Sequence, residues 1–404
     1  MTEEKIGEVT GSFTLRRGAD GFLTGWRAEV SVADGKLAIP LLFDGDTAVD
    51  RLTFAADNDL VADRLTIERL DLASNQSTIA VHGVVTGLLA ELPAVKIDGT
   101  LANIPVLSIG ELWPKGVADG AREWIVKNVS AGSIDSGVIR MNLSSEALES
   151  GQIPNDQARI ELAYSGASLA YIDGLPLLTG VKGTALVLGN RFESDIQTGH
   201  VGALSLSEGR VTIEDLNRKG EPANINATVT GKASDVLALI DMKPLGYPSR
   251  YGLDPATVGG DAVIHLGLAV PTLDAVKVEE IVFDIKASLA NVSMAIVNNI
   301  RLTAGAADFV ITGAGMTAKG QGRIAGVTGT FEWDENFNPP PGETSTRFSA
   351  SAVVSEALRR ELGVDPGDYL DGDAAVRVSM TGRGFNPVTA NAEVDLTAAR
   401  LHVP

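Results

Sequence analysis

A long sequence unit occurs twice in this chain, and it restricts the possible folds more than any other feature. The first copy joins Gly252–Pro255 to Gly260–Val263, and the second joins Gly363–Pro366 to Gly372–Ala375. In both copies a short helix-like segment precedes the unit and an alternating apolar strand follows it. A long unit that recurs along a chain is typical of a modular, elongated protein, because each copy packs mainly against its neighbours.

A fainter third copy lies upstream, where a helix-like stretch precedes Gly137 and an alternating strand follows it. The matching glycines Gly137, Gly260 and Gly372 lie 123 and 112 positions apart. This nearly constant spacing predicts one continuous, repeat-built segment over residues 1–404. Its approximate modules are 1–145, 146–270 and 271–404.

Strict alternation of apolar and polar residues dominates the chain, as in Ile225–Val229 and Ile281–Ile285. Such alternation predicts half-buried β-strands. Short Gly- and Asp-rich steps, including Asp34-Gly35 and Asp98-Gly99, lie between or beside these stretches. Because such steps reach positive φ at little cost, they predict tight hairpins. Strands joined by hairpins indicate one long antiparallel meander.

A meander with one apolar face must close into a barrel, fold into a sandwich, or curl over a ligand. Hydrophobic residues make up 44% of the chain but aromatic residues only 5%. Val, Leu, Ile, Ala and Met therefore form the apolar faces, which suits a smooth aliphatic trough, although an aliphatic sandwich core would look the same. We expect a mainly β fold: an elongated, curled antiparallel β-sheet that forms an apolar, U-shaped groove, built of repeats with a few short α-helices.

Three short helices are expected at the ends of the repeats, at Ser108–Asn128, Asp235–Met242 and Ser355–Leu362. Ser234 or Asp235 is a candidate N-cap for the second helix, and Ser355 for the third. The proline-rich stretch 338–342 predicts a loop, because proline fits neither a helix interior nor a central strand.

The charge balance excludes two classes of partner. The chain has 33 basic and 52 acidic residues, a net charge of −19. Nucleic-acid binding and adsorption to anionic membranes both depend on an excess of Lys and Arg, so neither is expected. The chain has no cysteine, which excludes disulfides and thiol chemistry.

The four histidines do not form a metal site in the sequence. His82, His200, His265 and His402 each stand alone among strand residues, without a second ligand at metal-binding spacing. A structural role is expected for each of them, and no metal is predicted.

Acidic residues at Asp365, Asp368, Asp371 and Asp373 are as dense as a calcium loop but lack its register and its distal Glu. Two of them recur in the first copy of the unit, which favours a role in turns.

The glycines of Gly320-x-Gly322-x-x-Ala325 match a loose dinucleotide fingerprint, but the following residues continue as a strand instead of a helix. No nucleophile elbow, phosphate loop or zinc-protease motif is present in the sequence. We therefore expect no enzymatic activity and no cofactor.

Several stretches carry a family resemblance when they are taken in order. They are Leu112-Trp113-Pro114 with Ala121–Ile125, then Tyr171–Leu178, then Gly320–Gly326 with Phe331–Glu335. Over roughly residues 90–390 the chain resembles the AsmA-like superfamily, and specifically its YhdP-type branch.

The resemblance implies a large envelope protein of Gram-negative bacteria, anchored in the inner membrane by an N-terminal helix. Its periplasmic body would be a long, curled β-sheet with an apolar groove, similar to eukaryotic bridge-like lipid-transfer proteins. The implied function is the transport of phospholipid, or another acyl-chain lipid, between the inner and outer membranes. The chain lacks the anchor, which we expect in the full-length protein, and no protein partner is indicated.

One face of the three repeated strands is expected to line the groove. Its residues are Ile139, Met141 and Leu143; Ile264, Leu266 and Leu268; and Val376, Val378 and Met380. By alternation, His265 and Arg377 would face solvent. An ordinary packed core behind the repeat helices is the alternative interpretation of the same residues.

Two other classes of function remain open. One is a structural or scaffolding protein, a closed β-solenoid or adhesin-like rod without lipid cargo. The other, a carbohydrate-active enzyme, requires paired carboxylates beside aromatic platforms. Only four Trp and five Tyr are spread over the chain, which disfavours it.

Overall fold

The structure is a computed structural model. It describes residues 7–38, 46–89, 91, 93–113, 119–273, 276–297, 300–324, 326–361, 367–384 and 386–402. Two predicted features lie partly or wholly outside these residues: Gly363–Pro366 of the second repeat copy, and Pro114.

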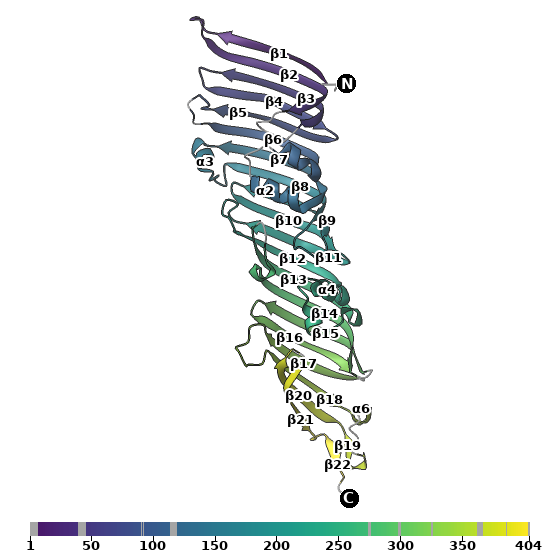
Figure 1. Ribbon diagram of the computed structural model, residues 1–404. Helices are drawn as coiled ribbons and strands as arrows, with labels where there is room; N and C mark the ends of the chain where they lie inside the picture. The colour runs from purple at the N-terminus through teal and green to yellow at the C-terminus, as the bar shows by residue number, and fades with distance from the viewer. Residues whose placement is uncertain are drawn as a thin grey trace.

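The described residues form one antiparallel sheet of 20 strands and a separate two-stranded sheet (Figure 1). In the large sheet each strand pairs with the next one along the chain, so the topology is a continuous meander. Its strands are β1 (Glu8–Arg17), β2 (Leu23–Ala38), β3 (Asp46–Asp59), β4 (Arg64–Ser74), β5 (Ser77–Thr86), β6 (Ala94–Pro105), β7 (Val129–Leu143), β8 (Ala158–Leu169), β9 (Leu178–Leu188), β10 (Arg191–Val201), β11 (Leu204–Ile213), β12 (Pro222–Lys232), β13 (Gly259–Pro271), β14 (Val282–Val297), β15 (Ile300–Thr312), β16 (Gly315–Ile324), β17 (Val327–Asn336), β18 (Thr346–Val354), β20 (Ala374–Arg383) and β21 (Asn386–Asp395). The predicted fold class, a mainly β, elongated antiparallel sheet with few short helices, is confirmed.

The large sheet is not closed into a barrel. Within the described residues β1 pairs only with β2, and β21 pairs only with β20. The small sheet joins β19 (Leu370–Gly372) to β22 (Ala399–Leu401). The accessible surface is 24071 Å², whereas a compact protein of this mass exposes about 15,000 Å². The molecule is therefore extended, and much of the sheet has no second layer over it.

Helical insertions interrupt the meander after β6, after β12 and after β18 in the described part of the chain. Because each strand reverses direction, an even number of strands returns the chain to the same edge of the sheet. The three insertions thus lie along one edge, here called the helix edge, as α4 and α6 show in Figure 1. The short helix α3, between β7 and β8, lies at the opposite edge.

The first insertion holds a 3₁₀ turn η1 (Val106–Ser108), α1 (Ile109–Leu112) and α2 (Asp119–Asn128). The second holds α4 (Ala233–Asp241), α5 (Tyr247–Arg250) and the 3₁₀ turn η2 (Pro255–Thr257), and the third holds α6 (Glu356–Glu361) and the 3₁₀ turn η4 (Gly367–Tyr369). The remaining short elements are α3 (Ser145–Ser150) and the 3₁₀ turn η3 (Val278–Glu280). All three predicted helical regions are thus found, the first as two separate helices.

The predicted helix caps are only partly correct. The Ser355 hydroxyl accepts a hydrogen bond from the Leu358 amide at 3.4 Å, as an N-cap should. The cap predicted for the second helix is wrong, because α4 begins at Ala233, two residues earlier than predicted, and its N-cap Lys232 makes no side-chain capping bond. The chain enters α4 directly from β12, so the strand end sets the helix start.

Two predicted hairpins are also wrong. Asp34-Gly35 lies inside β2 and Asp98-Gly99 lies inside β6. Asp34 does take a positive φ of 49°, but Gly35 pairs with Val49, so the strand continues through this position. At Gly99 the Ala80 carbonyl oxygen lies 3.0 Å from where a Cβ would be, so this glycine allows a close strand approach. Cross-strand pairing here outweighs local turn propensity.

The helical insertions pack against the sheet through small apolar clusters. Leu112 of α1 packs on a buried cluster of Val49, Leu52 and Leu72. In the second insertion, Leu237 of α4 packs on the cluster that contains Ala233, Val258 and Val292. These clusters cover limited parts of the sheet.

Candidate functional site

The strand β13 shows how the two faces of the sheet differ. Ile264 is buried, with 8% of its surface exposed, and Leu266 and Leu268 are half-buried on the same side. Their neighbour His265 is exposed on the other side, where its Nδ1 lies 3.2 Å from the Thr228 hydroxyl. We call the side of Leu266 the inner face and the side of His265 the outer face.

The inner face continues without a break from β13 to β7. Residues that lie directly opposite each other in an antiparallel pair have side chains on the same face of the sheet. The series of opposed residues runs Leu268, Ile225, Val211, Ser194, Ala185, Leu162 and Gly137. No register shift separates Gly137 from the rest of β7 toward its end, so Ile139, Met141 and Leu143 also belong to the inner face.

The inner face also continues from β13 to β20. This series of opposed residues runs Ile264, Ala287, Phe309, Ala318, Trp333, Phe348 and Met380. Val376 and Val378 alternate with Met380 on β20 and share its face, whereas the exposed Arg377 lies on the outer face. The structure therefore brings all nine predicted groove residues onto one continuous surface.

Toward the N-terminus the same surface reaches the first strand. The series runs Ile139, Gly99, Val81, Leu70, Phe54, Val30 and Gly11. Alternation from Gly11 places Phe13 and Leu15 on the inner face of β1, where they are 63% and 52% exposed. Sequence reasoning from the repeated strands alone missed this part, although the alternation in β1 to β6 carries the same signal.

Exposure along the inner face is graded. Leu143 is 9% exposed and Ile264 8%, whereas Val378 is 38% exposed and Val394 of β21 is 54% exposed. A packed core behind the repeat helices would bury all of these side chains. The inner face is instead an apolar surface that is covered in places and open in others.

Polar side chains on the inner face hydrogen bond to one another. The Tyr164 and Ser194 hydroxyls lie 2.8 Å apart, and burial is the main cause that raises the pKa of Tyr164. Glu335 and Thr346 are 6% and 2% exposed, and the Thr346 hydroxyl donates to Glu335 Oε2 at 2.6 Å. Satisfying these groups within the face limits the cost of placing them beside apolar side chains.

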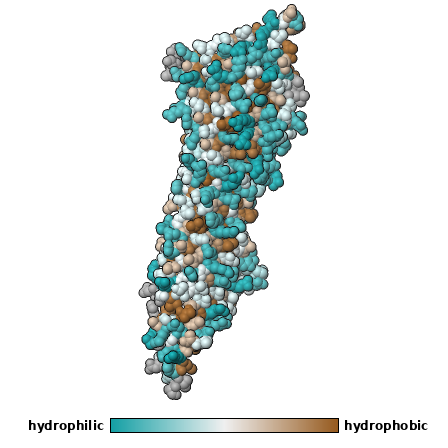
Figure 2. All heavy atoms as spheres, turned by 180° about the vertical axis from the view of Figure 1, so that it is seen from behind, coloured by the Kyte–Doolittle hydropathy of each residue, from teal (hydrophilic) through white to brown (hydrophobic). Residues whose placement is uncertain are grey.

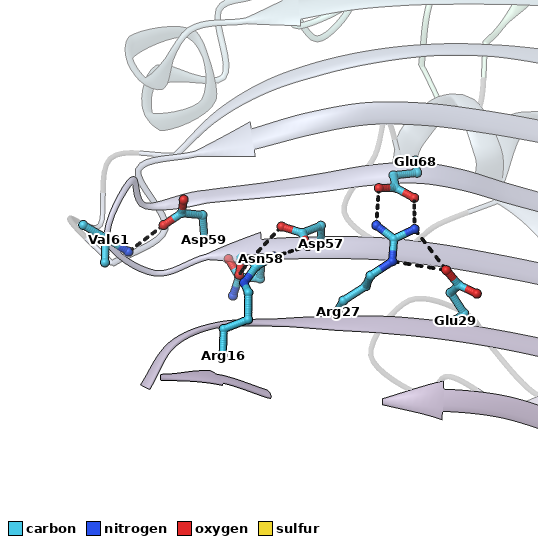
Figure 3. Close-up of polar contacts among 8 residues, drawn as sticks. All are labelled: Arg16, Arg27, Glu29, Asp57, Asn58, Asp59, Val61 and Glu68. Carbon is cyan, nitrogen blue, oxygen red and sulfur yellow. Dashed lines mark hydrogen bonds and ion pairs between the residues drawn. The ribbon is translucent and has the colours of Figure 1, made fainter. Parts of the chain in front are cut away.

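The outer face carries cross-strand ion pairs. Figure 3 shows Arg27 donating to Glu68 at 2.6 and 2.7 Å and to Glu29 at 3.0 and 3.1 Å. Beside them Arg16 donates to both carboxylate oxygens of Asp57, at 2.6 and 2.8 Å. This hydrogen bond lowers the pKa of Asp57 below its usual value.

Similar pairs recur farther along the sheet, at Lys232–Asp261 and Lys319–Glu332. Seen from behind, the molecule is predominantly hydrophilic, with hydrophobic patches in between (Figure 2). An amphipathic sheet of this kind keeps one side in water while the other presents apolar surface.

The remaining sequence candidates have ordinary environments. Gly320 and Gly322 lie in β16, and Ala325 is outside the described residues. Asp371 contacts His402, with Oδ2 and Nε2 2.8 Å apart, and Asp365 is outside the described residues. The described part of the chain contains no group of three or more His, Cys, Asp or Glu side chains that could hold a metal ion.

No helix among the described residues is long and apolar enough to cross a membrane. The predictions of no metal, no cofactor and no nucleic-acid partner stay predictions.

Comparison with known proteins gives one match. A family model described as YhdP protein matches residues 7–404, which is nearly the whole chain. No curated protein and no solved structure gives a significant match.

Proposed function

Because the chain belongs to the YhdP family, we propose that its inner face binds the acyl chains of phospholipid and lets them move along the sheet. Family membership indicates a lipid-transport-related protein of the bacterial envelope. The finer proposal is a periplasmic segment that carries phospholipid between the inner and outer membranes. In the full-length protein the segment would be tethered to the inner membrane.

One observation carries this proposal: the inner face is continuous and mainly apolar from β1 to β20, and much of it is uncovered. Each methylene moved from water to an apolar surface gains about 0.8 kcal/mol. A hydrocarbon tail therefore binds such a face without any specific polar contact. The headgroup stays in water, so the groove needs no closed cavity.

The aliphatic character of the inner face favours movement over tight binding at one place. Val, Leu, Ile and Ala recur from strand to strand, so neighbouring positions along the groove have similar affinity for a tail. Small differences in affinity mean small barriers between adjacent positions. The ion pairs and net charge of −19 keep the outer face hydrated.

The test is direct. The purified protein is extracted with organic solvent and the extract is examined for phospholipid by mass spectrometry. In parallel, the delipidated protein is titrated with a fluorescent fatty acid. We expect copurified phospholipid and saturable probe binding. A preparation without lipid that also fails to bind the probe would refute the proposal and favour a structural role without cargo.

A further inference from the structure

A segment of the second helical insertion crosses the inner face. It comprises α5 and the residues after it, 247–253, and is called the strap below. The strap is connected to β12 and β13 at the helix edge of the sheet. Tyr251 of the strap nevertheless contacts Trp333 of β17, with ring centroids 6.5 Å apart and planes at 80°.

Tyr251 also contacts a residue at the opposite edge of the sheet. Gly384 occupies the turn between β20 and β21, and β20 begins at the helix edge, so this turn is at the far edge. A Cβ on Gly384 would lie 3.0 and 3.1 Å from Tyr251 Cδ1 and Cε1. The Tyr251 ring thus lies against the Gly384 backbone, and the strap spans the groove from one edge to the other.

Trp333 lies on the inner face beneath the strap, where its indole is hydrogen bonded. Its Nε1 donates to Glu335 Oε2 at 3.1 Å, and the Thr346 hydroxyl donates to the same oxygen at 2.6 Å. Phe331 and Phe348 stack beside it, with ring centroids 6.2 Å apart. A chain with only 5% aromatic residues therefore places four rings at this one point of the inner face.

The strap is anchored close to both of its ends, because Pro248 of α5 is buried and Leu253 packs on the cluster of Ala233, Val258 and Val292. Asp241 of α4 also holds the strap, accepting hydrogen bonds from the Ser249 amide at 2.7 Å and from the Ser249 hydroxyl at 2.6 Å. Gly246 precedes the strap and Gly252 lies within it, after Tyr251; their φ angles are 63° and 70°, and a Cβ on either would meet no atom within 4 Å. These two glycines lie on either side of residues 247–251, which include Tyr251, and are suited to act as hinges for that part of the strap.

We propose that Tyr251 and Trp333 form a gate in the groove. With the rings in contact, the aromatic floor is covered, and an acyl chain passes this point only when the strap lifts. The gate separates the inner face of β13 to β16 from that of β18 to β21. The inference rests on the proposed function, because a gate matters only if acyl chains occupy the groove.

Quenching of tryptophan fluorescence by brominated acyl chains tests the gate. The chain has four Trp, so two single-tryptophan proteins are made. One keeps Trp333 and carries W26F, W113F and W124F. The other keeps Trp26 and carries W113F, W124F and W333F. Trp26 is a matched control because it also lies on the inner face, opposite Leu15, and stacks on Phe13 with ring centroids 5.9 Å apart.

Each protein is prepared with Tyr251, with Tyr251→Phe and with Tyr251→Ala. It is loaded from phosphatidylcholine vesicles whose acyl chains are brominated, and then separated from the vesicles. Circular dichroism checks that every variant is folded. Tyr251→Phe keeps the ring contact, so it shows whether the ring or the hydroxyl provides the cover.

We expect bound lipid to quench Trp26 in all variants. Trp333 should be quenched at least threefold less than Trp26 with Tyr or Phe at position 251, and as strongly as Trp26 in Tyr251→Ala. Equal quenching of both tryptophans in the native strap would overturn the gate, as would a Trp333 that stays protected in Tyr251→Ala. If Trp26 is not quenched in any variant, the groove holds no acyl chains and the proposed function fails with the gate.

Discussion

The inner and outer faces of a single strand provide the sharpest comparison for lipid binding. Leu266 and His265 are adjacent in β13 but point to opposite faces. Leu266 lies opposite Ala227 on one side and Ile285 on the other, in the middle of the apolar surface. We predict that Leu266→Asp weakens binding of a fluorescent fatty acid, whereas His265→Asp leaves it unchanged.

The magnitude follows from the strand spacing. A tail that runs along the groove passes one strand every ~4.8 Å, a length that we take as roughly three methylenes. Losing apolar contact with these methylenes, at about 0.8 kcal/mol each, costs about 2 kcal/mol. Because 1.4 kcal/mol corresponds to a tenfold change, the Kd for a tail bound over Leu266 should rise about thirtyfold.

Fluorescence titration of the delipidated protein measures the effect, and thermal unfolding checks that both variants are folded. The two substitutions add negative charge to the same strand, so a general effect of charge would weaken binding in both. Leu266→Ala should fall between the native protein and Leu266→Asp. The assignment of the inner face as the lipid-binding side would be refuted if Leu266→Asp and His265→Asp gave the same Kd and also bound the same number of probe molecules per protein.

Three further predictions concern stability. Gly260 has φ of 125°, and a Cβ there would lie 2.8 Å from the Ala290 carbonyl oxygen. In a urea titration Gly260→Ala should therefore lower the free energy of unfolding by about 1–3 kcal/mol. Gly313→Ala, at a site with open space, should change the free energy of unfolding little. Leu204 is 3% exposed, and Leu204→Ala should lower the free energy of unfolding by about 2–5 kcal/mol. Leu216 is 40% exposed and should tolerate the same change. Similar losses at both positions would contradict the burial pattern. The hydrogen bond from Arg16 lowers the pKa of Asp57. The ion pair therefore stabilises the fold fully above the unfolded pKa of about 3.9, and this stabilisation is lost as the pH falls through the lower folded pKa. In this acid range Tm should fall less steeply with pH for Asp57→Asn than for the native protein, and an unchanged slope would argue against the ion pair.

Much of the fold could be predicted from the local periodicity of the sequence. In β7, β13 and β20 the alternation of residue types was enough to divide inner from outer side chains, because a strand turns each successive side chain to the opposite face. The three helical regions were predicted from the helix-like segments that precede the repeated unit, and Ser355 caps α6 as its position predicts. These features depend on residues close together in the chain.

Local signals failed where a distant strand decides the outcome. Asp34-Gly35 and Asp98-Gly99 have turn chemistry, but each is held in an extended strand by its neighbours. Turn propensity amounts to a small energy per residue, whereas a central strand gains hydrogen bonds and side-chain contacts on both sides. The residues near Asp34-Gly35 or Asp98-Gly99 in the sequence do not indicate which strands will pair with them.

The amino-acid sequence by itself determined that this protein is a long meander with one apolar and one polar face, because that pattern repeats every two residues. Only the tertiary structure decided that the apolar face stays continuous from strand to strand, since this depends on the register of every pair. It alone also placed Tyr251 over Trp333, which is 82 positions away in the chain. A contact of that kind arises from where the sheet brings distant segments, and no local pattern of residues encodes it.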